Sequence, residues 1–406
     1  MNIAFQRAVD HYIGVPVCAA LSLWHRLFGR AAGGPPQRAI LVILLSEMGS
    51  LVLAEPMFTR LRSRYPAASI HVLLFARNRE MLDLLGVVPP EQVHTLDDRS
   101  LGGLLADAAL ALRRLRALKV DAVVDCELFS RVSSILSYLS GARLRAGFHR
   151  HTQEGLYRGS FINRPVLYNP YRHLSLQLLS LVTALESTGT PLAKEPVEPM
   201  PAGPPLLAFG AGEREQAAAL LQEQFPAVAR RRLVLVYPGG GLLPIRAWPL
   251  ESFVQLCTGL LADGLAVGVV GLADDRPLAQ QLVARCASER CLDLTGYTKS
   301  IRHLLALFHR AELLIANDGG PGQFAALTPI ASIVLFGPET PLLYRSLSAN
   351  AHHFHLALPC SPCLTAYNHR SSPCDGDNRC LKLIQPAQVL ATARALLGLP
   401  SAAAPS

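Results

Sequence analysis

Short apolar runs that end abruptly in glycine- and proline-rich turns constrain the fold of this chain most strongly. Leu313–Ala316 is followed by the turn Asn317–Gly322, and Ile333–Phe336 is followed by the turn Gly337–Pro341. Runs of this length and composition are typical of strands buried on both faces. In an open α/β sheet, ligands bind outside the carboxyl ends of the strands, and glycine lets the backbone approach them closely. We therefore predict that these turns bind an anionic, nucleotide-linked ligand.

The same strand–turn–helix unit repeats along the chain, which predicts an α/β fold with parallel sheets. A stretch rich in Pro, Gly and Ala near 188–212 divides the repeats into two groups. We expect two doubly wound, Rossmann-like domains that face a cleft. The expected parts are an amphipathic segment at 1–35, an N-terminal domain at 36–195, a linker at 196–225 and a C-terminal domain at 226–406. The expected strands are Ala39–Leu45, Ile70–Phe75, Ala122–Val124, Leu233–Tyr237, Ala266–Val270 and the two runs above.

Composition narrows the class of partner. The chain has 406 residues, a net charge of +8 and 50% hydrophobic residues, which excludes a disordered protein. A basic balance suits nucleic acid, anionic lipid or an anionic substrate. Because no basic patch interleaved with aromatic residues is present, nucleic acid is not an expected partner. The lack of a recognisable secretion signal predicts a cytoplasmic protein with reduced thiols.

The N-terminal segment Tyr12–Phe28 is apolar as far as Trp24 and then basic at His25 and Arg26. The apolar run is too short to span a bilayer and contains a proline. One interpretation is an interfacial anchor on the inner face of the cytoplasmic membrane, with Trp24 and Phe28 in the lipid. The alternative is a helix packed on the protein's own core.

Several motifs together resemble the family 9 glycosyltransferases, the ADP-heptose:lipopolysaccharide heptosyltransferases and their relatives. The resemblance covers roughly Arg38 to the end, and its motifs are Ser46–Ser50, Arg246–Pro249, Leu294–Gly296, Asn317–Phe324 and Phe336–Pro338. It implies the GT-B architecture, with the acceptor on the N-terminal domain and the nucleotide-sugar donor on the C-terminal domain. It also implies transfer with inversion and without a catalytic metal or other cofactor.

Two motifs depart from the family pattern. The family usually shows Asp-Ser-Gly-Pro-x-His, whereas this chain has Asp318-Gly-Gly-Pro-Gly-Gln323. Many members carry Gly-Asp after the first strand, whose Asp is the proposed base, whereas this chain has Gly49-Ser50. Both departures weaken the expectation that the sugar is heptose.

Glycosyl transfer needs a base that takes the acceptor proton and groups that stabilise the leaving diphosphate. Glu47 is the first candidate for the base, beside Ser50, and the alternative is a solvated loop carboxylate or a helix-capping partner. Asp125 and Glu127 follow another strand and could orient the acceptor, replace Glu47 or serve structural hydrogen bonds. The segment Arg145–Arg172 is rich in Arg, His and Tyr and is either an acceptor-binding loop or a solvated one.

Arg246 is the expected diphosphate ligand, since arginine binds phosphate oxygens in a bidentate manner. A surface ion pair is the alternative. By resemblance Asp318 sits at the donor site, with helix capping as the alternative role. The other candidate donor-binding residues lie at strand ends and are Gly239, Gly240, Gly241, Gly271, Gly319, Gly320, Pro321, Gln323 and Glu339.

A cluster of four cysteines lies near the C-terminus, in the loop 360–380. Cys360, Cys363, Cys374 and Cys380 contain one Cys-x-x-Cys pair and suit a tetrahedral structural metal, zinc by default. They also resemble the metal-binding finger of autotransporter heptosyltransferases, where the metal is iron. His369 and Asp375 are substitute ligands, and free cysteines or disulfides are the alternative.

These observations predict an inverting glycosyltransferase. It would move a sugar from ADP-heptose or another nucleoside-diphosphate sugar to a lipopolysaccharide, polysaccharide or other lipid-linked acceptor. The alternatives are a non-catalytic sugar-nucleotide-binding scaffold and a GT-B sugar-nucleotide epimerase.

Overall fold

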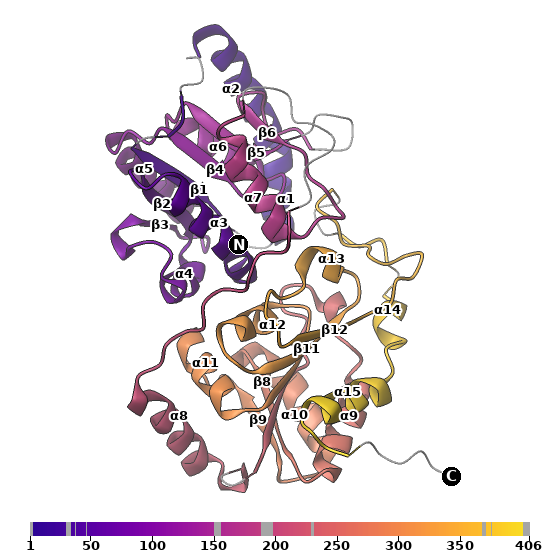
Figure 1. Cartoon of the computed structure of the whole chain (residues 1–406). Coiled ribbons are helices and arrows are strands. Elements are labelled where there is room, and N and C mark those ends of the chain that lie inside the picture. The colour runs from indigo at the N-terminus through magenta and orange to yellow at the C-terminus, as the bar shows by residue number, and fades with distance from the viewer. Residues whose placement is uncertain are drawn as a thin grey trace. The chain divides into compact units, whose positions relative to one another are not determined.

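Each half of the chain builds one fully parallel six-stranded sheet (Figure 1). The computed structural model describes residues 3–29, 34–36, 38–45, 47–149, 156–187, 198–228, 231–367, 371–374 and 376–400. They form two compact units: unit 1 holds residues up to Pro201 together with Ala366–Arg370, and unit 2 holds Ala202–Thr365 together with the residues from Ser371 onward.

The sheet of unit 1 has the strand order β3-β2-β1-β4-β5-β6. The strand order reverses beside β1, so the loops after β1 and β4 diverge to opposite faces and leave a crevice at the carboxyl edge. The strands are β1 (Ala39–Ile43), β2 (Ser69–Phe75), β3 (Val93–Leu96), β4 (Ala122–Asp125), β5 (Leu144–Phe148) and β6 (Arg164–Val166). The helices are α3 (Met48–Arg64), α4 (Arg79–Leu85), α5 (Leu101–Ala117), α6 (Arg131–Leu139) and α7 (Leu174–Ala184), with short 3-10 turns η1 (Ala76–Asn78) and η2 (Pro90–Gln92).

The sheet of unit 2 repeats this plan with the order β12-β11-β10-β7-β8-β9. Its order reverses between β7 and β10, which places the second crevice at their carboxyl ends. The strands are β7 (Leu233–Tyr237), β8 (Ala266–Gly271), β9 (Cys291–Thr295), β10 (Leu313–Asn317), β11 (Ala331–Phe336) and β12 (Ala351–His355). The helices are α8 (Ala211–Gln224), α9 (Leu250–Ala262), α10 (Arg276–Cys286), α11 (Ile301–Arg310), α12 (Gly320–Phe324), α13 (Pro341–Tyr344), α14 (Arg379–Lys382) and α15 (Pro386–Leu396), with 3-10 turns η3 (Pro226–Val228), η4 (Pro244–Arg246), η5 (Ala273–Asp275) and η6 (Ala325–Leu327).

Burial explains why the apolar runs become strands. Every residue of β1, β7 and β10 is buried, as a parallel sheet covered by helices on both faces requires. Trp248 is 2% exposed and packs in the core of unit 2 against Phe253, with its indole N–H donating to the carbonyl of Ile384. The predicted strands and the α/β class are confirmed.

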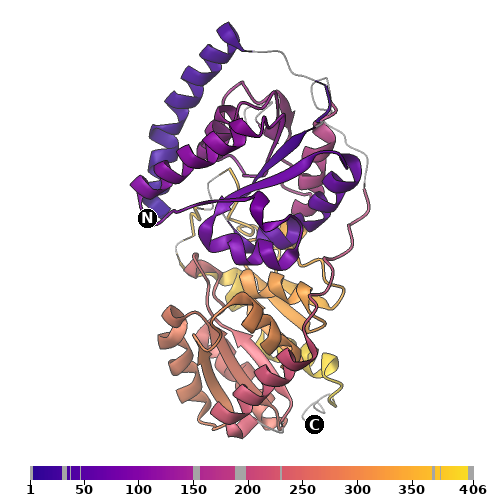
Figure 2. The ribbon, with the colours of Figure 1, turned by 90° about the vertical axis from the view of Figure 1, so that its left-hand side faces the viewer.

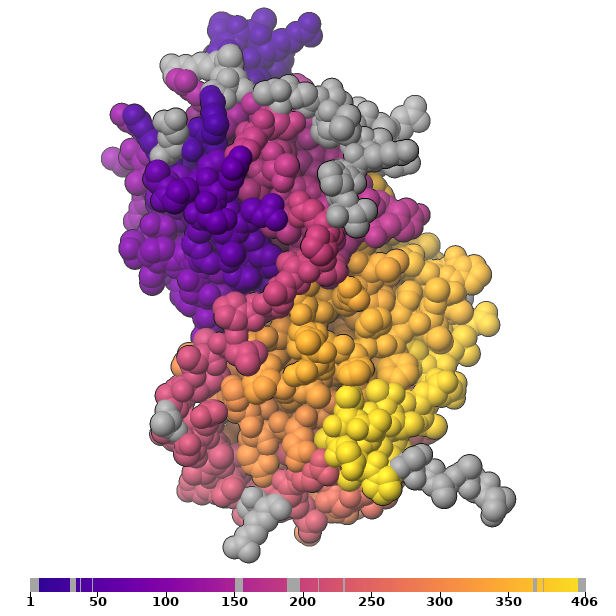
Figure 3. Space-filling view, in the orientation of Figure 1, coloured from indigo at the N-terminus to yellow at the C-terminus, as the bar shows by residue number. Residues whose placement is uncertain are grey.

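The second half of the linker predicted over 196–225 contains α8. This helix belongs to unit 2, because Glu213 accepts from Arg302 of α11 over 2.8 Å. The boundary between the two units falls at Pro201 and Ala202, inside the predicted linker. The C-terminal helix α15 lies on the outside of unit 2, where Figure 3 shows it in yellow, and packs against α9.

The N-terminal segment forms two helices of unit 1, α1 (Ile3–Tyr12) and α2 (Gly14–Phe28). One side of α2 packs against α6: a side chain at Gly14 would meet the Arg131 side chain at 2.7 Å, and Cys18 is fully buried. The last turns of α2 extend past the sheet of unit 1 (Figure 2). In the described part of the chain, none of the helices has both the length and the apolar character needed to cross a membrane.

Candidate functional site

Asn317 organises the carboxyl edge of the unit 2 sheet. It is the last residue of β10 and is fully buried. Its Nδ2 donates to the carbonyls of Pro238 at 2.8 Å and Gly239 at 3.1 Å, and its Oδ1 accepts from the backbone N–H of Trp248 at 3.0 Å. The amide thereby holds the turn after β7 against β10. Sequence reasoning did not assign Asn317 a role, although its place at a strand end was a usable signal.

Arg246 lies beside two buried carboxylates at this edge. Its Nη2 donates to Oε1 of Glu339 over 3.1 Å, and its Nε is 3.6 Å from Oδ2 of Asp318. The three residues come from η4, from the turn after β10 and from the turn after β11. Among the described residues, Nε of Arg246 is buried and has no hydrogen-bond partner. The three predicted donor-binding residues are therefore brought together, and one guanidinium N–H remains unused.

Burial controls the ionisation of this group. It raises the pKa of Glu339 to about 8, an effect that Arg246 opposes and the charge of Asp318 reinforces. Burial also raises the pKa of Asp318, against the pull of Arg246. Burial alone would lower the pKa of Arg246, but Asp318 and Glu339 raise it above its usual value. One guanidinium therefore faces two carboxyl groups that compete for it, and a proton on Glu339 reduces their mutual repulsion.

The glycine turn after β7 runs beside this group. Gly241 has φ +60°, a left-handed conformation that favours glycine. A side chain on Gly239 would meet Oδ1 of Asp275 at 2.9 Å, and one on Gly240 would meet the carbonyl of Leu243 at 2.7 Å. The turn therefore needs small residues to keep its backbone close to its neighbours. Gly271, the last residue of β8, is likewise closed in by the Asp275 carboxylate.

The turn after β10 leads into the short helix α12, which contains Gly320, Pro321 and Gln323 and is preceded by Gly319. The side-chain Nε2 of Gln323 donates to the carbonyl of Tyr344 over 2.6 Å, which fastens α12 to α13. Gln323 is 7% exposed and its Oε1 is buried without a hydrogen-bond partner among the described residues. One N–H of the Gln323 amide therefore serves the fold, and the contact of Gln323 with the donor stays a prediction.

In unit 1, the backbone of Leu45 joins three loops at the carboxyl edge of the sheet. Its N–H donates to Oε1 of Glu127 over 2.6 Å, and its carbonyl accepts from Nδ2 of Asn78 over 2.6 Å. Glu127 follows β4, Asn78 follows β2, and both are buried. Glu47 lies two residues beyond Leu45. The loop that carries the predicted base is therefore anchored from both sides.

Glu47 is the residue before the first turn of α3, and its carbonyl accepts from the backbone N–H of Ser50 over 3.1 Å. Both residues are partly exposed. The Glu47 side chain makes no capping hydrogen bond, so the helix-capping alternative is not what holds it. Ser46, the first residue of the predicted loop, lies outside the described residues.

Asp125 is held in a buried network. It is 1% exposed, forms an ion pair with the fully buried Arg158, and accepts from Ser133 at 3.0 Å and from the backbone N–H of Glu127 at 3.1 Å. Arg158 also donates to the carbonyls of Glu127 and Phe148. Burial raises the pKa of Asp125, against the charge of Arg158. Asp125 thus has the structural hydrogen bonds that were its alternative role.

The segment predicted as an acceptor loop, Arg145–Arg172, is mostly framework where it is described. Arg145 and Arg158 are buried, and residues 150–155 lie outside the described residues. Arg158 was not singled out from the sequence, because no local pattern marks an arginine that folds back under two strand ends.

The four cysteines differ in burial and in their contacts. Cys360 and Cys374 are exposed and Cys380 is buried. Cys363 Sγ lies 3.1 Å from the hydroxyl of Ser372, and Cys380 Sγ is 3.4 Å from Oδ1 of Asn378. Across the described ranges, no group of three or more His, Cys, Asp or Glu side chains could hold a metal ion. These thiols therefore do not fit the predicted tetrahedral site, and His369 and Asp375 lie outside the described residues.

Comparisons with known proteins agree with this picture. The family model described as glycosyltransferase family 9 (heptosyltransferase) matches residues 109–371. Lipopolysaccharide heptosyltransferase 2 of Escherichia coli is 24% identical over 88% of this chain and 98% of its own length.

Solved structures share the fold. The structure of E. coli ADP-heptose lipopolysaccharide heptosyltransferase II is 22% identical, with a TM-score of 0.67 over 88% of this chain and 98% of that one. An E. coli heptosyltransferase with ADP-2-deoxy-2-fluoro heptose is 16% identical, with a TM-score of 0.55 over 78% of this chain and 92% of that one. At these identities the likeness shows the fold, which is GT-B.

Proposed function

Since this chain belongs to glycosyltransferase family 9 (heptosyltransferase) and is a glycosyltransferase, we propose that it transfers a heptosyl group with inversion from ADP-heptose to a lipopolysaccharide-type acceptor. The main support for donor binding on unit 2 comes from Arg246, which is buried where the strand order reverses. Its Nε lacks a hydrogen-bond partner among the described residues. The names of the relatives described above include ADP-heptose and lipopolysaccharide, which supports this choice of donor and acceptor.

The diphosphate of the donor binds beside Arg246 and the turn Gly239–Gly241. The unused Nε–H is a donor for a phosphate oxygen, and a charged hydrogen bond of this kind is stronger than a neutral one. Asp318 and Glu339 hold the guanidinium in place from two sides. They also limit the sites where an anion fits, because a phosphate close to both carboxylates would be repelled unless Glu339 carries a proton.

The chemistry requires one bond to form and one to break. The acceptor hydroxyl oxygen attacks the anomeric carbon, and the bond from that carbon to the β-phosphate oxygen breaks. The electron pair of that bond leaves with ADP, whose developing charge Arg246 stabilises. The proton of the acceptor hydroxyl passes to a carboxylate on unit 1, for which we propose Glu47.

Glu127 and Asp125 act in this proposal as positioning residues. Glu127 holds the backbone of Leu45 and so sets the height of the Glu47 loop above the sheet. Asp125 and Arg158 pair with each other and both hydrogen-bond the backbone of Glu127, which holds the loop after β4. Ser50 lies in the first turn of α3 and contributes no base, because a serine hydroxyl does not ionise near neutral pH.

We place the enzyme in the cytoplasm, as a peripheral protein of the inner membrane face. The exposed side of α2 supports this: Leu23, Trp24, Leu27 and Phe28 are each 58 to 65% exposed, and the Trp24 and Phe28 rings contact each other at a tilt, with centroids 4.6 Å apart. Exposed aromatic residues beside basic ones are typical of helices that lie in a membrane interface. The sequence alternative, a helix packed on the protein core, accounts for the opposite side of the same helix.

The test measures ADP release from a panel of ADP-sugars and other nucleotide sugars, with a lipid extract that contains truncated lipopolysaccharide as acceptor. Release from ADP-heptose only when the acceptor is present, lost in Glu47→Gln, supports the proposal. Tight binding of ADP-heptose without any turnover in the unaltered chain would favour a non-catalytic sugar-nucleotide-binding scaffold.

A further inference from the structure

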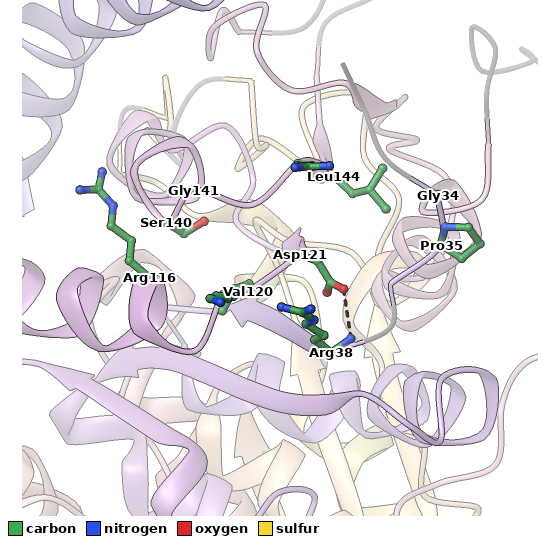
Figure 4. A pocket seen from close by; sticks show the side chains of 11 residues that line it. Gly34, Pro35, Arg38, Arg116, Val120, Asp121, Ser140, Gly141 and Leu144 are labelled. Carbon is green, nitrogen blue, oxygen red and sulfur yellow. Dashed lines mark hydrogen bonds between the residues drawn. The ribbon is translucent and has the colours of Figure 1, made fainter. Parts of the chain in front are cut away.

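A hollow of about 590 Å³ opens at the amino ends of β1, β4 and β5 in unit 1 (Figure 4). In a parallel sheet the amino ends of all strands lie at one edge, and the Glu47 and Glu127 loops lie at the other. A five-residue strand separates the two edges by about 16 Å. The hollow therefore lies at the opposite edge of the sheet from the loops of Glu47 and Glu127, where we placed the reaction with the acceptor.

Four cations line this hollow, together with one carboxylate: Arg38, Arg116, Lys119 and Arg143 with Asp121. Asp121 accepts from the backbone N–H groups of Arg38 at 3.0 Å and Ala39 at 3.3 Å, so its charge is engaged in holding β1. Between residues that the structure describes, no ion pair involves any of the four cations. Their convergence in one concave site produces a positive potential that attracts an anion.

Only one of these cations has a clear structural role. Nε of Arg116 donates to the carbonyl of Leu139 over 2.7 Å at the end of α6, where a cation also complements the helix dipole. Arg38, Lys119 and Arg143 are exposed, and between residues that the structure describes their side chains donate no hydrogen bond to a carbonyl or a carboxylate. Plain solvation explains one exposed cation at a time, but it does not explain why they surround a common hollow.

The exposed apolar end of α2 lies at the same end of unit 1. His25 of α2 packs edge-on against Tyr138 of α6 at 5.6 Å, and Ser140, just beyond α6, lines the hollow. Gly34 lines the hollow and lies five residues after Gly29, the residue that follows α2, so the two are at most roughly 18 Å apart. Trp24 and Phe28 on α2, and Leu118 beside Lys119, add exposed apolar surface around these cations.

We propose that the hollow binds the phosphate of an anionic lipid headgroup while Trp24 and Phe28 enter the lipid interface. Apolar residues alone would bind any bilayer, and cations alone would bind any polyanion, whereas the two together match an anionic membrane surface. The proposal rests on the proposed function only in placing the acceptor at a membrane. It adds the lipid class and the residues that recognise it.

The experiment measures binding of the full chain to vesicles of phosphatidylcholine alone and of phosphatidylcholine with phosphatidylglycerol. The test variant carries Arg38→Gln, Lys119→Gln and Arg143→Gln. The control carries Arg113→Gln, Arg214→Gln and Arg231→Gln, which remove the same charge from exposed cations outside the hollow. We expect the test variant to lose on the order of 100-fold in binding to the anionic vesicles, and the control to lose much less.

Tryptophan emission gives a second readout, because the chain has 2 tryptophans. Trp24 is 58% exposed and Trp248 is 2% exposed, so a blue shift on adding anionic vesicles reports entry of Trp24 into lipid. Excess glycerol 3-phosphate should weaken the binding of the unaltered chain by occupying the hollow.

Three outcomes would overturn the proposal. They are equal binding to both kinds of vesicle, equal losses in the test and control variants, and binding that glycerol 3-phosphate leaves unchanged. ADP binding by the same proteins is measured in parallel. A chain that binds anionic vesicles but not ADP would contradict the proposed function while leaving the membrane site intact.

Discussion

The guanidinium of Arg246 donates to the carboxylate of Glu339, which lies 93 residues later in the chain, over 3.1 Å. The two residues meet because β7, β10 and β11 are neighbours in the sheet and end at the same edge. The same guanidinium faces Asp318 at 3.6 Å. Arg246 is therefore both the proposed phosphate ligand and the counter-charge for two buried acids. A substitution that tests phosphate binding must keep this positive charge.

Replacing Arg246 by alanine would leave buried carboxylates unpaired and endanger the fold. Arg246→Lys keeps the charge and removes the forked geometry. We expect this variant to remain folded and to bind ADP roughly 10- to 100-fold more weakly, as loss of one or two charged hydrogen bonds implies. Titration calorimetry with ADP measures the effect. Arg232→Lys is the control, since Arg232 pairs with Glu312 on the surface of unit 2; equal losses in both variants would contradict the assignment.

Donor binding should weaken as the pH rises through about 8, the pKa to which burial raises Glu339. Below this pH the Glu339 carboxyl is protonated and neutral, and above it a second negative charge faces the donor diphosphate. The same raised pKa makes this group's contribution to stability complete at low pH, and that contribution is lost as the pH rises through about 8. Glu339→Gln should bind the intact nucleotide sugar with an affinity that is flat from pH 7 to 9. A pH dependence that persists in this variant would assign the effect to another group.

Glu47→Gln should lower kcat by about 10²- to 10⁴-fold, the usual contribution of a general base. The KM for the donor should not change, because Glu47 lies on unit 1 and the donor residues lie on unit 2. Steady-state ADP release measures both constants, with Glu91→Gln as the control at an exposed carboxylate of unit 1. A large loss in Ser50→Ala together with full activity in Glu47→Gln would reverse the assignment.

Two substitutions of Glu127 distinguish a positioning role of this residue from a catalytic one. Glu127→Gln retains an oxygen that can accept from the Leu45 N–H, whereas Glu127→Ala leaves that N–H without its 2.6 Å partner. We expect alanine to cost about 1 to 3 kcal/mol in the free energy of unfolding and to lower kcat. Glutamine should restore most of both. If glutamine restores stability but not kcat, the carboxylate itself takes part in the reaction.

The cysteine loop can be tested by thiol reactivity. Cys360 and Cys374 are exposed and should react quickly with a maleimide. Cys380 should react slowly, because burial, with the charges of Cys363 and Cys360, raises the pKa of its thiol to about 11. Mass spectrometry of the labelled chain identifies the sites. Protection of all four thiols until a chelator is added would show that they converge on a metal after all.

Local sequence was enough to determine the strands. β1, β7 and β10 are continuous apolar runs that only a doubly covered parallel sheet can bury, and the turn after β7 contains glycines that have little room for a side chain. The order of these units along the chain was also enough to predict two doubly wound halves. The composition near 196–225 resembles a spacer and could not reveal α8, because the contact between α8 and α11 that orders this helix is made far along the chain.

Only the tertiary structure decided which polar residues meet. Arg246, Asp318 and Glu339 share one edge because the sheet order places their strands side by side, and no local pattern contains that order. Arg158 folds back beneath Asp125, which turned a candidate catalytic acid into part of the framework. The basic hollow is assembled from the starts of β1, β4 and β5, where single cations in the sequence looked like ordinary solvated surface. The role of a charged side chain could be assigned only when its burial and its neighbours were known, because these determine the electrostatic energy of the charge.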